Sequence, residues 1–316
     1  MKFYMAPMEG MTGYVFRNVY HKYYGDVDKY FTPFLCSTGL SHKELHDVMP
    51  EHNQGMPVVP QILTDRAEDF LKIAERLKEF GYDTVNLNLG CPSGTVVSKG
   101  RGAGFLKDTE RLERFLEEIF AGCPLKISVK TRIGVQAPEE WGKLQEIYNC
   151  FPLEELIVHP RVQKDFYRHP VRREMFRSVL EQSSMPVCYN GDLHSVTDFR
   201  EFTAAYPDVD CVMMGRGIFK DPGLVRACKN RSVTQEERFS TLRAMLAELL
   251  AEYRREMGND THTLYKMKEV WTYLGQSIPG GERPLKEITK ARSISEYKVA
   301  AGEALRRWEE NCCMDN

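Results

Sequence analysis

Residues 84–90 read Thr-Val-Asn-Leu-Asn-Leu-Gly, and this stretch sets the expectation for the fold. Its apolar and β-favouring residues predict a short strand that ends at Gly90. Seven further runs of this kind occur in the first 220 residues, and their starts lie roughly 24 to 42 residues apart, the length of one strand–helix unit. The eight runs begin at Phe3, Lys29, Val58, Thr84, Lys126, Glu155, Val187 and Cys211.

Helical patterns fill most of the gaps, notably over residues 65–80, 108–120, 138–151 and 171–182. Strands that alternate with helices predict a parallel sheet with right-handed crossovers. Eight such units favour a closed (β/α)8 TIM barrel, an α/β fold. The alternative is a doubly wound open sheet, which usually carries a glycine-rich dinucleotide-binding turn after its first strand. Residues 6–10 (APMEG) cannot form that turn, so we expect the barrel.

The character of the chain changes after Asn230. Residues 233–257, 263–274 and 293–309 follow helical spacing, and almost no strand signal remains. We therefore predict a TIM-barrel domain over residues 1–232 and a small all-helical domain over residues 233–316.

Composition excludes several classes of protein. Hydrophobic residues make up 42% of the chain, charged residues make up 28%, and the formal net charge is −2. These values are ordinary for a globular protein and argue against disorder, collagen and binding of nucleic acid through bulk charge. The nine cysteines form no C-x-x-C pair, so we expect no metal site. The absence of a leader-like or 18-residue apolar run leads us to expect a cytoplasmic protein without a membrane partner. We also expect a monomer, although no motif in the sequence decides the oligomeric state.

The predicted strand ends are unusually polar. In a TIM barrel the chemistry lies at the carboxyl ends of the strands, so these residues should surround one mouth. They supply amide, ammonium, imidazole, guanidinium and thiol groups. The strand ends are Pro7-Met8, Gln61, residues 86–92, residues 130–132, residues 159–161, residues 190–192 and residues 215–217.

Several of these residues allow more than one interpretation. Gly191 and Gly215, followed by Arg216, favour a phosphate site at the seventh and eighth strands over two ordinary turns. Lys130 is a candidate Schiff-base lysine, a fixed cation beside a cofactor ring, or a solvated side chain. Gln61 offers one donor and one acceptor, which suit the edge of a flavin or a uracil ring.

Cys91 lies between Gly90 and Pro92, in a turn and not in a core strand. An ordinary loop thiol is mostly protonated at neutral pH, so it could act as a general acid. A nucleophilic cysteine would need a basic partner, which Lys99 or His159 could supply. A purely structural turn cysteine is the third alternative.

Taken in chain order, a set of motifs at these strand ends carries a specific resemblance. The motifs are residues 6–12 (APMEGMT) with Phe16-Arg17, Gln61, residues 86–92 (NLNLGCP), residues 99–104 (KGRGAG), residues 128–134 (SVKTRIG), His159 with Arg161, residues 190–192 (NGD) and residues 215–217 (GRG). Over essentially its full length the chain resembles the tRNA-dihydrouridine synthase family. It departs from the family pattern at Gly13, at Pro160 and over residues 161–167.

The resemblance implies a flavoprotein in which NADPH reduces FMN and the reduced FMN reduces uridine in tRNA. Cys91 would donate the proton, and the helical domain would bind tRNA. The implied FMN contacts are Ala6, Pro7, Met8, Gln61, Lys130, His159, Asn190, Gly191, Asp192, Gly215 and Arg216. The implied uracil pocket is Asn88, Arg132 and Tyr167, and we also expect Lys99 and Arg101 to contact the substrate.

The cations are concentrated in two segments that could face RNA. Residues 161–177 hold Arg161, Lys164, Arg168, Arg172, Arg173 and Arg177, and residues 264–292 hold Lys266, Lys268, Arg283, Lys286, Lys290 and Arg292. Of the aromatic residues among them, we expect Tyr265, Trp271 and Tyr273 in the helical core. Two rival functions stay open: a flavin barrel that reduces a free small molecule, and a non-catalytic RNA-binding protein.

Overall fold

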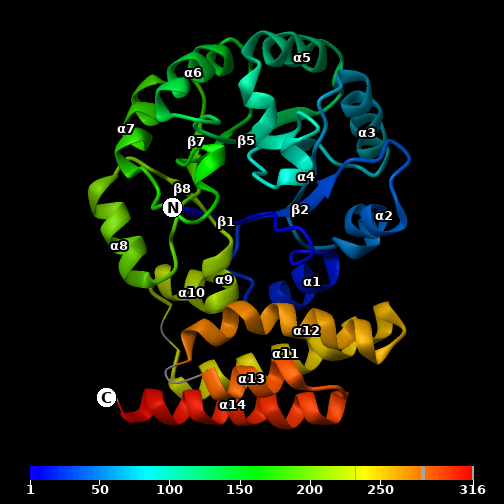
Figure 1. Ribbon diagram of the computed structural model, residues 1–316, viewed down its shortest axis with the longest axis vertical. Helices are drawn as coiled ribbons and strands as arrows, with labels where there is room; N and C mark the ends of the chain where they lie inside the picture. The colour runs from blue at the N-terminus through cyan, green and yellow to red at the C-terminus, as the bar shows by residue number, and fades with distance from the viewer. Residues whose placement is uncertain (232, 279–281, 315–316) are drawn as a thin grey trace. The chain divides into compact units, whose positions relative to one another are not determined.

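The computed structural model describes residues 1–231, 233–278 and 282–314, and it contains a closed barrel of eight parallel strands in chain order (Figure 1). β1 pairs with both β2 and β8, which closes the barrel. The predicted (β/α)8 architecture is therefore confirmed. The strands are β1 (Lys2–Met5), β2 (Lys29–Leu35), β3 (Val58–Ile62), β4 (Thr84–Leu89), β5 (Lys126–Arg132), β6 (Leu156–His159), β7 (Val187–Tyr189) and β8 (Cys211–Met214).

Helices follow every strand, including several that periodicity does not reveal. The predicted ones are present as α3 (Ala67–Glu79), α5 (Thr109–Gly122), α6 (Trp141–Asn149), α7 (Arg173–Gln182), α11 (Gln235–Met257), α12 (Asp260–Leu274) and α14 (Ile294–Met314). The additional ones are α1 (Tyr14–Tyr23), α2 (His42–Val48), α4 (Gly94–Val97), α8 (Val196–Ala205), α9 (Arg216–Lys220), α10 (Leu224–Cys228) and α13 (Glu282–Lys290). Short 3-10 turns are η1 (Pro50–His52), η2 (Gly102–Lys107), η3 (Pro138–Glu140), η4 (Gln163–Asp165) and η5 (Gly275–Ser277).

Strand alternation decides which side chains enter the barrel. Residues two apart on a strand share a face, and residues in register on parallel neighbours point the same way. Alternate positions on or just after the strands contribute to one apolar cluster, which contains Tyr4, Ala6, Phe31, Val59, Ile157, Cys188, Cys211 and Met213. The next inward positions are polar: Gln61 follows Val59 on β3, and His159 follows Ile157 on β6. The apolar cluster therefore lies beneath a layer of polar side chains at the carboxyl ends of the strands.

The chain forms two compact units that do not follow chain order. The first unit contains residues 1–9, 28–192 and 202–214, and it includes all eight strands. The second contains residues 10–27, 193–201 and 215–316. The functional boundary between residues 232 and 233 stays a prediction, and Ser232 lies outside the described residues.

The second unit is a helical assembly in which α11 packs on both α1 and α12, and α13 packs on α14. Figure 1 shows α11 to α14 running side by side. Lys22 of α1 forms an ion pair with Glu248 of α11 at 2.6 Å, and the Tyr23 hydroxyl donates to the same carboxylate. Of the three aromatic residues expected in this core, Trp271 is buried, whereas the side chain of Tyr265 is exposed. No helix in the described ranges is long and apolar enough to span a membrane.

Candidate active site

A chain of buried amide and hydroxyl groups crosses β3, β4 and β5. The Asn88 amide donates to Gln61 Oε1 at 2.7 Å, Gln61 Nε2 donates to Asn86 Oδ1 at 2.7 Å, and Asn86 Nδ2 donates to Ser128 Oγ at 2.8 Å. All four side chains are buried. Buried polar groups cost free energy unless they are paired, so this chain of bonds fixes each side chain in one orientation. Gln61 keeps one amide hydrogen and one oxygen lone pair for a further partner.

The same network holds Cys91 at the end of β4. Asn88 Oδ1 accepts hydrogen bonds from the backbone N–H groups of Gly90, at 3.0 Å, and Cys91, at 2.9 Å. Behind Cys91, Gly102 has φ +55°, and a Cβ at this position would lie 2.9 Å from the Cys91 carbonyl oxygen. Gly102 therefore lets the chain pass closely behind Cys91. Burial raises the pKa of the half-buried Cys91 thiol, although Lys130 and Arg132 partly oppose the shift. Cys91 is thus a protonated thiol at neutral pH.

Lys130 lies two residues after Ser128 on β5 and is in register with Asn88 of β4. Its side chain is half-buried. Burial, reinforced by the nearby Arg132 guanidinium, lowers the pKa of Lys130 to about 8. Lys130 and Arg132, which are two residues apart on β5, therefore point into the same barrel interior. The ammonium is a charge that an anionic or electron-rich ligand would stabilise.

His159, Arg161 and Asp192 form a second polar group at the ends of β6 and β7. Arg161 donates through Nη1 to His159 Nε2 at 2.8 Å and makes a two-pronged ion pair with the Asp192 carboxylate. Burial, together with the charges of Arg132, Lys130 and Arg161, lowers the pKa of His159 well below its usual value. The imidazole is neutral, and because Nε2 accepts from Arg161, its proton must lie on Nδ1. His159 therefore offers one N–H donor.

Arg132 ties the loop after β6 to the loop that carries Cys91. Its Nε donates to Gly90 O at 3.0 Å, its Nη1 to Val162 O at 2.8 Å and its Nη2 to Phe166 O at 3.0 Å. The Arg132 side chain is fully buried. Its guanidinium carbon lies 5.4 Å from the centre of the Tyr167 ring, and the His159 ring lies 5.9 Å from the same centre. Asn88, Arg132 and Tyr167, the predicted uracil pocket, are thus linked to Cys91 through Gly90.

The remaining residues that are predicted to contact the cofactor lie at the ends of β1, β7 and β8. The Ala6 N–H donates to Met214 O across the barrel seam, and Pro7 and Met8 are half-buried just beyond it. Asn190 Nδ2 donates to Met213 O at 2.9 Å, which ties the end of β7 to β8. The residues after these two strands belong to different units.

Gly191 lies in the first unit, where a Cβ would come within 2.1 Å of the Tyr189 hydroxyl, so packing alone requires glycine there. Gly215 and Arg216 lie in the second unit, where they begin α9.

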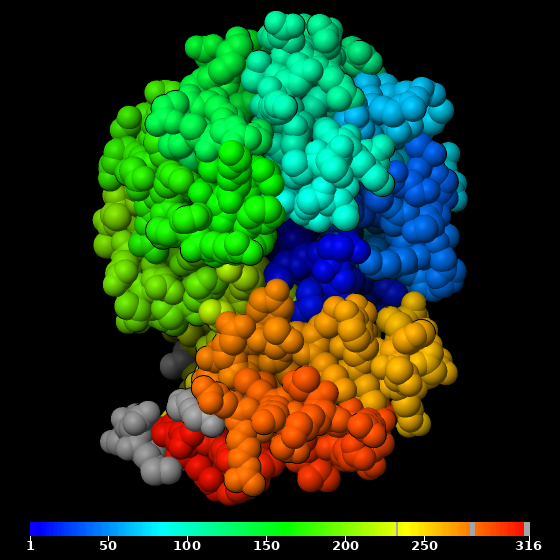
Figure 2. Space-filling model, viewed as in Figure 1, coloured from blue at the N-terminus to red at the C-terminus, as the bar shows by residue number. Residues whose placement is uncertain are grey.

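Lys99 and Arg101 differ in exposure although they are close in sequence. Lys99 is exposed. Arg101 donates through Nε to Asp65 Oδ1 at 2.9 Å, and Arg111 pairs with the same carboxylate. Asp65 therefore fixes the Arg101 side chain. Residues around α4 (cyan) lie on the outer surface of the face shown in Figure 2.

Almost the whole chain is similar to one protein family. The family model described as dihydrouridine synthase (Dus) matches residues 4–305. The chain belongs to the dihydrouridine synthase family. Within that family, a probable tRNA-dihydrouridine synthase from Staphylococcus aureus (strain COL) is 27% identical, covering 98% of this chain and 94% of that protein. A tRNA-dihydrouridine(16) synthase from Vibrio parahaemolyticus is 26% identical, covering 94% and 95% of the two chains.

A solved structure confirms the fold of this dihydrouridine synthase family member. Histamine dehydrogenase from Rhizobium sp. 4-9 superimposes with a TM-score of 0.54 at 11% identity, covering 79% of this chain and 49% of that one. In this family member no cluster of three or more His, Cys, Asp and Glu side chains is placed to hold a metal ion, as far as the described residues extend.

The cations of residues 161–177 do not form one exposed face in this family member. Arg161 is buried against His159 and Asp192, and Arg172 pairs with the buried Asp165. Lys164 and Arg168 are exposed. Sequence reasoning counted Arg161 among the surface cations, but the structure buries it because its guanidinium pairs with His159 and Asp192.

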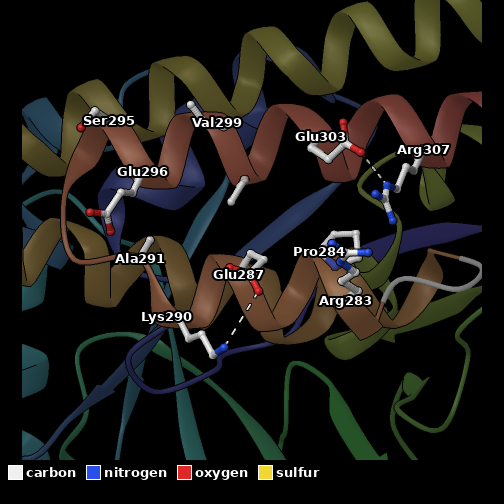
Figure 3. A pocket seen from close by; sticks show the side chains of 11 residues that line it. Arg283, Pro284, Glu287, Lys290, Ala291, Ser295, Glu296, Val299, Glu303 and Arg307 are labelled. Carbon is white, nitrogen blue, oxygen red and sulfur yellow. Dashed lines mark hydrogen bonds and ion pairs between the residues drawn. The ribbon is translucent and has the colours of Figure 1, made fainter.

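The cations of α13 border a groove between α13 and α14 (Figure 3). The groove has a volume of about 610 Å³. Lys290 lies 4.0 Å from Glu287, and Arg307 donates to Glu303 at 2.6 Å. Carboxylates therefore alternate with the cations along this groove. Lys286 is exposed on the same helix.

Proposed function

We propose that this protein reduces uridine in tRNA to 5,6-dihydrouridine, using FMN that NADPH reduces. Family membership over residues 4–305 and the names of the curated relatives support this function. The observation that carries it is the Cys91 thiol, which burial keeps protonated and which Asn88 holds beside the polar interior of the barrel. A proton donor of this kind is what the reduction of a pyrimidine double bond requires.

The inward side chains fit a flavin. A flavin ring needs donors and acceptors along its pyrimidine edge, and the free donor and acceptor of Gln61, the Lys130 ammonium and the Nδ1–H of His159 are groups of this type. We assign Asn190, Gly191, Asp192, Gly215 and Arg216 to the ribityl phosphate end, and the backbone of Ala6, Pro7 and Met8 to the ring. Bound FMN would supply the hydride that reaches C6 of uracil.

The residues of this chain then donate the proton and orient the uracil base. Cys91 gives its proton to C5 of uracil. The charge of Lys130 stabilises negative charge that develops nearby in the transition state. A base within a folded tRNA has to leave its stack to reach a barrel mouth, so the uridine is flipped out. Asn88, Arg132 and Tyr167 orient the flipped ring, while Lys99 and Arg101 contact the backbone.

The test compares the proposed acid with a matched cysteine. Cys91→Ala should keep FMN and its oxidation of NADPH but lower dihydrouridine formation about 10²- to 10⁴-fold. Cys123→Ala, at the half-buried C-terminal end of α5, should leave product formation unchanged. The substrate is tRNA from a strain that lacks its own dihydrouridine synthases, and dihydrouridine is measured by mass spectrometry.

Each alternative has a distinct outcome in the same assay. Normal product yield from Cys91→Ala would contradict the assignment of the acid. Wild-type protein that reduces a cyclic enone but forms no dihydrouridine would favour a small-molecule reductase. Wild-type protein that binds tRNA but retains no flavin would favour a non-catalytic RNA-binding protein.

A further inference from the structure

The segment 164–168 (Lys-Asp-Phe-Tyr-Arg) presents two neighbouring aromatic side chains to solvent. Phe166 is 40% exposed and Tyr167 is 53% exposed, and few other large hydrophobic side chains in the described residues are so open. Exposed aromatic residues that stand together in one loop mark an interaction site more often than a single exposed one does. We propose that Phe166, with Lys164 and Arg168, forms a binding subsite for a second unpaired nucleobase of the RNA; this rests on the proposed function for its RNA substrate.

The backbone at Phe166 is strained, and hydrogen bonds from the surrounding residues hold it in that conformation. Phe166 has φ +47°, a conformation that bulky residues rarely adopt. Such strain persists only where the surroundings enforce it, and it is concentrated at functional sites. Here the buried Arg132 guanidinium holds the Phe166 carbonyl at 3.0 Å, and the Phe166 N–H donates to Gln163 O at 3.2 Å.

The rest of the loop is anchored just as firmly. Asp165 accepts from the Val162 N–H at 2.9 Å and pairs with Arg172, so its charge is neutralised within the loop. Gln163 Nε2 donates to Pro92 O at 3.3 Å, which connects the loop to the residue that follows Cys91. The subsite is therefore a preformed surface attached directly to the segment that carries the proposed acid.

The two aromatic rings have different surroundings. Tyr167 faces the His159 ring and the guanidinium groups of Arg132 and Arg161, so one of its faces is already occupied. In the described part of the chain, no aromatic ring or cation stacks on the Phe166 ring. Tyr167 therefore belongs to the pocket of the flipped uracil, whereas the ring of Phe166 is open to a separate planar group.

The cations two residues before and two residues after Phe166 in the sequence favour a nucleic acid as the source of that planar group. Lys164 and Arg168 are both exposed, and neither forms an ion pair with any carboxylate within the described ranges. An aromatic ring flanked by cations is the arrangement that binds single-stranded nucleotides, with the base stacked on the ring and the phosphates against the cations. A protein partner would need a larger apolar area than one ring between two charges supplies. Because every base has a flat face, the subsite accepts any base next to the flipped uridine.

The experiment separates stacking from simple packing. The affinity of the oxidised, FMN-bound protein for unmodified tRNA is measured without NADPH for four variants at position 166 and for wild type. Stacking predicts that Phe166→Ala and Phe166→Leu raise Kd about 5- to 150-fold and that Phe166→Trp and Phe166→Tyr stay close to wild type. Phe80→Ala, which truncates a half-buried ring covered by Arg76 on α3, is the matched control and should leave Kd unchanged.

The outcomes are decisive because binding and catalysis are read separately. A Phe166→Ala variant that binds tRNA as tightly as wild type overturns the subsite, as does a Phe166→Leu variant with wild-type affinity. Melting temperatures should match across the series because the ring is exposed, so loss of folding would be detected. If wild-type protein forms no dihydrouridine while the Phe166 series still behaves as expected, the proposed reaction fails and the RNA subsite stands.

Discussion

The half-buried Lys130 ammonium is the residue whose protonation most clearly connects the site to stability. Its pKa is lowered to about 8, whereas a lysine in the unfolded chain titrates near 10.4. Between these two values the unfolded state binds more protons than the folded state, so stability rises with pH. Below pH 8 the Lys130 side chain is charged in the folded protein, so the free energy of unfolding is lowered by the full penalty of burying that charge.

We therefore expect the free energy of unfolding of the flavin-free protein to increase by about 1–2 kcal/mol between pH 7.5 and pH 9.5 through Lys130 alone. Lys130→Met should remove this increase and stabilise the protein at pH 7.5, while FMN binds more weakly. Urea unfolding at the two pH values and FMN titration provide the measurements. A Lys130→Met variant with the pH dependence and FMN affinity of wild type would contradict both roles.

At the same scale, strand alternation accounts for which polar residues share a face but not for their partners. The alternation of β4 puts Asn86 and Asn88 on one face, and parallel register brings Ser128 and Lys130 beside them. That Asn88 holds the Cys91 backbone depends on a side-chain hydrogen bond within one turn of the chain, and that Arg161 is buried beside Asp192 depends on a contact between loops 31 residues apart. Periodicity carries no information about such contacts.

Among the elements, the segment from α4 to η2 shows how glycine positions set the place of a reactive side chain. Gly102→Ala would force a Cβ against the Cys91 carbonyl at a residue with positive φ, so we expect a loss of about 1–3 kcal/mol of stability and a changed rate of Cys91 alkylation. Gly94→Ala, in the same segment, meets no atom within 4 Å and should be neutral or slightly stabilising. Equal effects of the two substitutions on alkylation would show that the close approach does not position Cys91.

The helices show which elements a sequence can reveal. α3 and α5 have regular apolar stripes and acidic first turns, and their predicted ranges agree with the structure within two residues at each end. α1 was not predicted because its sequence, YVFRNVYHKY, is rich in aromatic and β-branched residues and its N-terminal Gly13 makes no side-chain cap. Such a helix forms because its buried face packs on other parts of the fold, and local propensity does not show this.

For the molecule as a whole, the net negative charge has to be reconciled with the proposed binding of tRNA. The formal net charge is −2, so attraction to tRNA must come from local cations. Reversal of Lys286 and Lys290 to Glu on α13 should weaken tRNA binding. The slope of log affinity against log salt should fall by about one for each phosphate that the variant no longer binds. NADPH oxidation by the bound flavin should not change.

The matched control reverses Lys72 and Lys78 on α3, which alters the net charge by the same amount on a different exposed helix. Affinity is measured across a salt series for both double variants. If the α13 and α3 variants bind tRNA alike, Lys286 and Lys290 are only solvated, and the RNA contact belongs to other cations such as Lys164 and Arg168.

The pairing of α1 with α11 has a consequence for how the protein is made. Lys22 and Glu248 are 226 residues apart in the chain. A ribosome adding about 5–20 residues per second needs on the order of 10 to 45 seconds to cover that distance. Throughout this interval α1 has been synthesised but its partner α11 has not, so the second unit cannot close until the residues between them have been translated. The second unit therefore assembles only after all eight strands of the barrel have been translated.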